Sequence, residues 1–168
     1  MKKYIVIFLI VFMIQPLYGQ VESEFNIFVG GGGGDISEAV LGIQAGGYIE
    51  NYNTSISIDT NVSIFNTIKE FDGMGGGVQL GGLVEYFFAY MFLIGAGGGI
   101  GWVTISVKSD DESENSKSHL FSYPYIRGSF SIRFFNGYDR GGFKVGLYYD
   151  YCFDIGNKVG IRFHYVFG

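Results

Sequence analysis

Residues 54–64 read TSISIDTNVSI, so isoleucine and valine alternate with serine, aspartate and asparagine along the segment. Successive side chains of a β-strand point to opposite faces of the sheet. A period of two therefore predicts a strand with one apolar face and one polar face. Ile56, Ile58, Val62 and Ile64 form the apolar face, and Asp59 lies on the polar one.

The same alternation recurs in seven other segments of the chain. Their apolar positions are Phe25, Ile27 and Val29; Leu41, Ile43, Ala45 and Ile49; Met74, Val78, Leu80, Val84 and Tyr86; Phe92, Ile94, Ala96, Ile100 and Trp102; Ile126, Phe130, Ile132 and Phe134; Phe143, Val145, Leu147, Tyr149, Tyr151 and Phe153; and Val159, Ile161, Phe163, Tyr165 and Phe167. We therefore expect eight strands of about 9 to 13 residues, a length that suits membrane-spanning strands.

Seven connections separate the expected strands, at residues 34–38, 50–53, 66–73, 87–91, 106–119, 136–141 and 154–157. In an up-and-down barrel the first, third, fifth and seventh connections share one end. The fifth is the longest and is rich in charge, with Lys108, Asp110, Asp111, Glu112, Glu114 and Lys117. We therefore expect one end with long charged loops, and a second end with short turns and both chain termini.

Residues 86–107 contain no charged side chain, so hydropathy alone would also allow a transmembrane helix. Five glycines between Gly95 and Gly101 argue against it, because each costs a helix about 1 kcal/mol relative to alanine. The alternation of Phe92, Ile94 and Ala96 instead favours a tight turn near Ala89 followed by a strand.

Composition limits the chain to one ordered domain. It has 168 residues, 48% of them hydrophobic and 16% charged, with 28 glycines that follow no collagen-like period. Without Lys2 and Lys3, nine basic residues face sixteen acidic ones, which argues against nucleic-acid binding. The single cysteine, Cys152, cannot form an internal disulfide.

The first residues have the layout of a secretory signal peptide. Lys2 and Lys3 precede an apolar run at residues 5–14, which is too short to span a bilayer, and a small residue, Gly19, follows. We expect residues 1–19 to be a cleaved signal peptide and residues 20–168 to be the mature β-barrel domain.

The polar phase of the expected strands indicates which face points inward. It consists mainly of glycine and serine, whereas a face exposed to water would carry dense lysine and glutamate. An eight-stranded barrel has an interior only wide enough for side chains, and small residues fit there. The apolar phase then faces lipid, and a soluble sandwich with an aromatic core is the less favoured alternative.

Aromatic residues gather near both ends of the expected strands, where a bilayer meets water. The membrane-interface candidates are Tyr86, Tyr90, Trp102, Tyr149, Tyr151, Tyr165 and Phe167. Two aromatic girdles are the expected arrangement.

Seven charged residues fall in the inward phase: Asp59, Glu85, Arg127, Arg133, Lys144, Asp150 and Arg162. Buried charges are tolerated when they are paired. We expect a salt-bridge network that fills the narrow lumen, and an ion-conducting lumen is the alternative.

The last strand resembles the C-terminal assembly signal of small bacterial outer-membrane β-barrel proteins of the OmpX, OmpW and OmpA-transmembrane-domain type. Lys158, Gly160, Phe163 and Tyr165 carry the resemblance: a polar residue, a glycine two positions later, and two aromatics separated by one residue. The chain ends on Gly168 instead of the usual aromatic. The resemblance implies an eight-stranded antiparallel transmembrane up-and-down β-barrel in the outer membrane, inserted by the barrel-assembly machinery.

No motif predicts catalytic, cofactor-binding or metal-binding residues. The glycines at residues 30–34 lack the Gly-Lys-Ser/Thr continuation of a phosphate loop, and the acidic residues of the long loop lack calcium-loop spacing. His119 lacks a defined catalytic partner, and we interpret His164 and Cys152 as interior filler.

The expected function is therefore that of a non-enzymatic integral outer-membrane protein. It would have a structural or adhesin-like role through surface-exposed loops, with outer-membrane lipids and an extracellular or host ligand as partners. A porin-like narrow channel for small or hydrophobic solutes is the alternative, and a lipid-modifying enzyme is less favoured.

Overall fold

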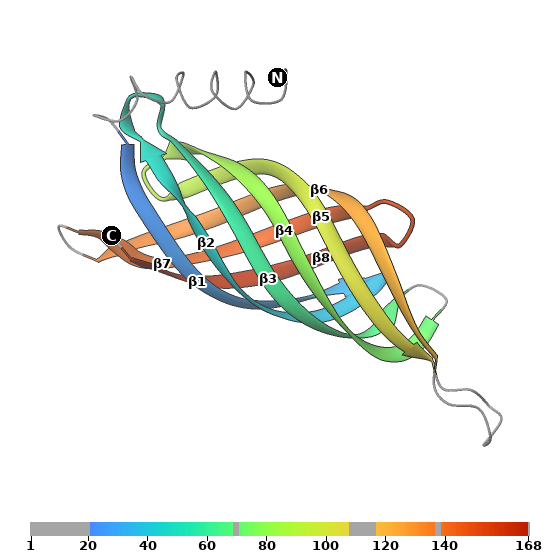
Figure 1. The fold of residues 1–168 in the computed structure, drawn as a ribbon. Helices are drawn as coiled ribbons and strands as arrows, with labels where there is room; N and C mark the ends of the chain where they lie inside the picture. The colour runs from blue at the N-terminus through green and yellow to red at the C-terminus, as the bar shows by residue number, and fades with distance from the viewer. Residues whose placement is uncertain (1–20, 69–70, 108–116, 137–138, 168) are drawn as a thin grey trace, which may run out of the picture.

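The computed structural model describes residues 21–68, 71–107, 117–136 and 139–167. The strands are β1 (Val21–Gly34), β2 (Ile36–Ile49), β3 (Thr54–Ile68), β4 (Phe71–Ala89), β5 (Phe92–Val107), β6 (Lys117–Asn136), β7 (Asp139–Cys152) and β8 (Gly156–Phe167), and a short 3-10 turn is η2 (Glu50–Tyr52). Each strand pairs with the next one, and β1 pairs with β8 (Figure 1). The prediction of an eight-stranded up-and-down barrel is confirmed.

The strand count places Val21 and Phe167, the first and last described residues, at one end of the barrel, which we call the terminal end (Figure 1). The turns η2 and Tyr90–Met91 lie there. The opposite end, which we call the loop end, receives the connections that follow β1, β3, β5 and β7. At this end, Asp35, which connects β1 to β2, is hydrogen-bonded to the start of β8. The Asp35 amide donates to the Asn157 carbonyl (2.9 Å), and the Asn157 amide donates to Asp35 Oδ2 (2.8 Å).

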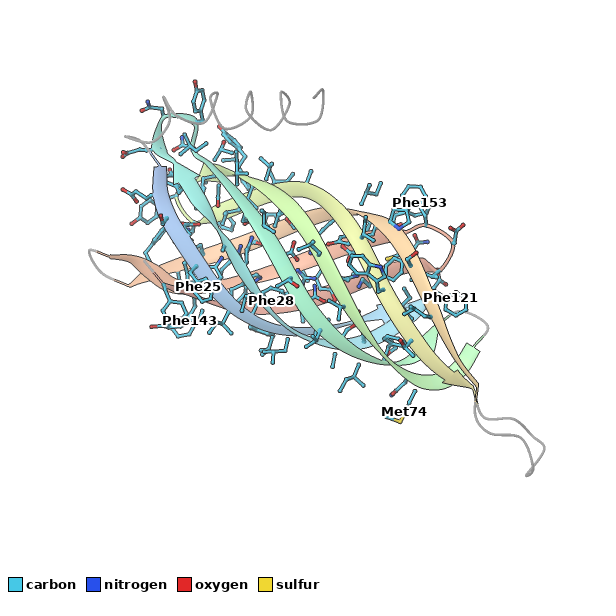
Figure 2. All side chains as sticks on the ribbon, in the orientation of Figure 1. Phe25, Phe28, Met74, Phe121, Phe143 and Phe153 are labelled. Carbon is cyan, nitrogen blue, oxygen red and sulfur yellow. The ribbon has the colours of Figure 1, made fainter. Side chains whose placement is uncertain are left out.

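Side chains alternate between the interior and the outer surface along the barrel. In β8 the buried positions Lys158, Gly160, Arg162, His164 and Val166 alternate with the exposed positions Val159, Ile161, Phe163, Tyr165 and Phe167. Figure 2 shows Phe143 and Met74 pointing away from the barrel, and Phe28 inside it is almost fully buried. The apolar phase is thus on the outside, as contact with lipid requires.

The strands are longer than expected. They have 12–20 residues, so the predicted range of about 9 to 13 is wrong for every strand except β8. The connection predicted at 66–73 is also wrong in extent, because β3 runs to Ile68 and β4 begins at Phe71. The connection at 34–38 shrinks in the same way to Asp35 alone. Backbone pairing does not need alternating side chains, so the ladders continue through polar residues.

Residues 86–107 form the end of β4, a turn at Tyr90–Met91 and β5, so the prediction of a turn followed by a strand is confirmed. Within the described part of the chain, no helix has the length and hydropathy needed to cross a membrane. The signal peptide predicted for residues 1–19 lies outside the described residues and stays a prediction.

Substitutions at Ile58 and Tyr52 test whether the apolar phase faces lipid. The two side chains have the same exposed fraction, 65%. Ile58 lies in the middle of β3 and Tyr52 in η2 at the terminal end. We expect Ile58→Arg to lower the free energy of unfolding by about 2–4 kcal/mol, the cost of arginine at the bilayer midplane, and Tyr52→Arg to cost about 1 kcal/mol or less. Urea unfolding from phospholipid vesicles measures both. Equal effects at the two positions would contradict a lipid-facing surface.

Candidate functional site

The barrel interior contains the buried charged side chains of the described chain. Five acidic and five basic side chains are buried there: Glu24, Glu38, Asp59, Glu85 and Asp150, with Arg127, Arg133, Lys144, Lys158 and Arg162. The described interior therefore carries no formal net charge. This balance matters because an unpaired charge is strongly unfavourable in a space without bulk water.

Arg127 is the centre of the largest ion-pair cluster. Its Nε and Nη2 donate to the two carboxylate oxygens of Asp150 (2.6 and 2.8 Å), a bidentate geometry, and its Nη1 donates to Asp59 Oδ2 (2.9 Å). Arg162 Nη1 lies 3.4 Å from the same Asp59 oxygen. Arg127 and Asp150 are directly opposite each other on β6 and β7, so the ladder register itself brings them together.

Lys158 links this cluster to the loop end. Its Nζ lies 2.7 Å from Glu38 Oε1 and 3.5 Å from Asp150 Oδ2, and both Lys158 and Asp150 have no exposed surface. Tyr148 also donates to Glu38 Oε1 (3.1 Å). An ammonium with two carboxylates and no contact with solvent fixes β8 against β2 and β7.

Two further ion pairs lie toward the terminal end. Lys144 on β7 contacts Glu85 Oε2 on β4 (2.8 Å), and Arg133 on β6 pairs with Glu24 on β1. Both pairs join strands that are not neighbours in the sheet. They therefore tie the barrel together across its lumen.

Six planar groups are stacked along the lumen. The Arg127 guanidinium lies 5.0 Å from the Tyr125 ring centre and 5.5 Å from the Tyr148 ring centre. The Arg162 guanidinium lies 4.6 Å from the ring centres of both Tyr148 and Phe28. The ring centres of Phe28 and His164 are 5.0 Å apart. Guanidinium groups over aromatic faces are favourable, more so when desolvated. The stack leaves little open cross-section in the middle of the barrel.

Each of four large interior rings lies opposite an inward-facing glycine on the adjacent strand. The pairs are Phe28 with Gly42, Phe65 with Gly75, Tyr123 with Gly101, and Tyr148 with Gly160. In every pair a Cβ on the glycine would collide with the ring. The glycine-rich inward phase is thus explained locally, because a missing side chain makes the room that a neighbouring ring fills.

An apolar cluster fills the interior at the loop end. Ile36, Phe65, Val103, Tyr123, Tyr125 and Cys152 form it, and Ile155 packs against it. At the terminal end the structure instead has a pocket of about 320 Å³, lined by residues that include Tyr48, Phe87, Tyr90, Arg133 and Phe135. Among the described residues, the interior is therefore filled by apolar side chains toward the loop end and has a pocket at the terminal end.

The seven charged residues predicted for the lumen all lie inside the barrel. Glu24, Glu38 and Lys158 also belong to the network, although they are not among the predicted lumen charges. The same alternation marks them, because each stands one position from an outward side chain, namely Phe25, Ala39 and Val159. Lys158 was expected only as part of the assembly signal.

The other predicted residues lie where the alternation puts them. The seven interface aromatics are all exposed; six of them lie on strands, and Tyr90 lies in the turn at the terminal end, where it lines the pocket. Phe163 and Tyr165 of the assembly signal are also exposed, whereas its Gly160 is buried. Asp110, Asp111, Glu112 and Glu114 lie outside the described residues. Among the residues that the structure describes, no three His, Cys, Asp or Glu side chains gather as a metal site would require.

No protein-family model and no curated protein matches the chain. Solved structures do match. The crystal structure of Ail, the attachment invasion locus protein of Yersinia pestis, in complex with the heparin analogue sucrose octasulfate, aligns with a TM-score of 0.60 at 11% identity, over 88% of this chain and 99% of that one. The backbone structure of the outer membrane protein Ail in a phospholipid bilayer nanodisc aligns with a TM-score of 0.53 at 13% identity, over 87% and 100%. The shared fold is that of a small eight-stranded outer-membrane barrel.

The Lys144–Glu85 pair tests whether the interior depends on charge balance. We expect Lys144→Met and Glu85→Gln each to lower the free energy of unfolding by about 3–5 kcal/mol, because each leaves one buried charge without its partner. The double variant should recover most of that loss. Urea unfolding from lipid vesicles gives the four values of the cycle. Losses that simply add in the double variant would show that the two charges do not depend on each other.

Proposed function

We propose that this chain is an integral outer-membrane protein that contacts partners outside the cell through its loop end. The outward apolar phase, the predicted signal peptide and the fold shared with outer-membrane barrels support this location. Bilayer lipids would surround the outer face, with Trp102, Tyr149 and Tyr151 near one interface and Tyr86 and Tyr165 near the other. In this orientation the terminal end faces the periplasm.

The alternative function, a channel for small solutes, has less support. The Arg127 cluster and the ring stack occupy the centre of the lumen, and the apolar cluster around Phe65 and Val103 fills its loop end. Eight strands enclose a space just wide enough for such side chains. A structural or surface-interaction role needs no such passage.

The observation that carries the proposal is a sheet that extends beyond the rest of the barrel at the loop end. At the loop end, the pairing between β6 and β7 stops at Tyr125, which lies opposite Cys152. The pairing between β6 and β5 continues further, to Lys117, which lies opposite Val107. Figure 1 shows β4, β5 and β6 running past the ends of β7 and β8. A projecting sheet places side chains and backbone outside the membrane, where a partner can reach them.

One edge of this extension is open. Leu120 and Ser122 of β6 pair with β5 but, within the described chain, with no strand on the other side. The Pro124 carbonyl accepts from the Phe153 amide on that open side, so the backbone groups of Ser122 and Leu120, two and four positions away, point the same way. An unpaired edge is the surface to which an extended peptide adds as a further strand.

Charge favours a protein partner over a polyanion. Of the charged residues in segments 66–73 and 106–119, six are acidic and three basic, and Asp35 and Asp154 add to the acidic side. The heparin analogue bound to Ail is highly negative, so that ligand class is not carried over to this chain. An extended segment of a basic or neutral extracellular protein suits the open edge and the acidic loops better.

The remaining roles belong to the same proposal. The last strand, with Lys158, Gly160, Phe163 and Tyr165, would be recognised by the barrel-assembly machinery during insertion. We propose no enzymatic activity, because the charged residues of the interior are buried and neutralise one another in ion pairs.

Conductance separates the two functions. We expect the refolded protein in a planar bilayer to show no large steady current, because side chains block the lumen from the loop end to its centre. Voltage-clamp recording at high salt makes the measurement, and a vesicle preparation without protein is its blank. A steady ohmic current that scales with the number of inserted molecules would favour the channel instead.

The open edge is tested by Ser122→Pro, with Ser122→Ala as the matched control. Proline removes the backbone donor on the open side and is tolerated on an edge strand, whereas alanine keeps that donor and loses only the hydroxyl. We expect cells displaying Ser122→Pro to attach to surfaces coated with extracellular-matrix proteins about two- to tenfold less well, the effect of one hydrogen bond made to a partner backbone.

Cells displaying Ser122→Ala should attach like the parent. Both variants should show the same shift in gel mobility on boiling, which reports a folded barrel. Equal attachment by the proline and alanine variants would contradict recognition through this edge.

A further inference from the structure

A small cavity lies in the middle of the interior, between the Arg127 cluster and the Lys144–Glu85 pair. Its volume is about 20 Å³, and Asp59, Ser129, Arg162 and His164 are among the side chains that line it. Cavities of this kind hold a water molecule when their probe-occupied volume exceeds roughly 10–15 Å³ and their walls are polar. The cavity meets both conditions.

Residues that line this cavity carry most of the buried polar atoms without a protein partner in the described chain. These atoms are Asp59 Oδ1, Ser129 Oγ, Arg162 Nε and Nη2, and His164 Nδ1, five of the nine such atoms in the described chain. Buried polar groups in folded proteins almost always have a hydrogen-bond partner, either from the protein or from ordered water. The grouping of five around one polar void points to an occupant that both donates and accepts.

The long ion pair between Arg162 and Asp59 also indicates that a further hydrogen-bonding group occupies the cavity. Its N–O distance is 3.4 Å, longer than the 2.7–2.9 Å that is usual for charge-assisted hydrogen bonds, while Arg127 holds the same carboxylate oxygen at 2.9 Å. Arg162 thus has donors without a protein acceptor and Asp59 has a second oxygen without a protein donor, and both residues line the cavity.

We propose that this cavity is a binding site for one ordered water molecule that donates to Asp59 Oδ1 and accepts from the Arg162 guanidinium. A halide ion fits less well for two reasons. The interior already balances five acidic against five basic side chains, and the free carboxylate oxygen of Asp59 would repel an anion. Water satisfies a donor and an acceptor together without adding charge.

The site is independent of the proposed surface role. It places a water molecule at the centre of the barrel between two groups of ion pairs, and a single water molecule is not a conducting column. The two residues that hold it come from β3 and β8, so the water joins two strands that do not pair with each other.

The test is a high-resolution crystal structure of the refolded mature protein, with crystals soaked in sodium bromide. We expect a spherical density peak within hydrogen-bond distance of Asp59 and Arg162, without anomalous signal at the bromine edge. An anomalous peak would show that the site takes an anion, and a cavity without density would show that it is dry. Either result overturns the proposal.

Two variants locate the water independently of the parent structure. Ser129→Val adds bulk to the cavity wall, so the density peak should disappear, whereas Ser129→Ala leaves the space open and should keep the peak. In solution, cross-relaxation between protein protons near the cavity and a long-lived water should be lost in the valine variant only. A peak and a cross-relaxation signal that persist in Ser129→Val would place the water elsewhere and contradict the assignment.

Discussion

Every backbone hydrogen bond of the spanning strands has to be made within the sheet, because hydrocarbon offers no partner for an unpaired amide or carbonyl. The pairing of β1 with β8 meets this requirement by removing both sheet edges where the barrel is complete. Closure with eight strands then fixes the width of the interior. The open edge of β6 occurs only where the sheet continues beyond β7, in a position that water can reach in the proposed orientation.

The narrow interior explains the unusual composition of the chain. A lumen that admits only side chains cannot solvate isolated charges, so five acidic and five basic groups neutralise one another. Large rings fit because glycines such as Gly42 and Gly160 lie directly opposite them. The narrow, filled interior therefore disfavours conduction. For this reason we assign the proposed function to the projecting sheet and not to the lumen.

Much of this arrangement could be predicted from the period of the sequence. Alternation around Asp59 correctly assigns a strand, its faces and the interior position of the charged side chains, because side-chain direction in a strand depends only on position. The partners of those charges could not be predicted. Arg133 meets Glu24, and Lys144 meets Glu85, across the lumen, and such pairs depend on the tilt and register of strands that are distant in sequence. Strand ends were also underestimated at Ile68 and Phe71, because pairing there continues through polar residues that break the alternation.

The central claim is that the apolar phase faces lipid, and Trp102, the single tryptophan of the chain, reports on it directly because it is exposed on the outer surface of β5. The measurement is quenching of its fluorescence in vesicles made from lipids with brominated acyl chains, compared with quenching by iodide in the surrounding water. Strong quenching by the brominated lipids and weak quenching by iodide is the expected result. Strong quenching by iodide with no effect of the brominated lipids would contradict the account.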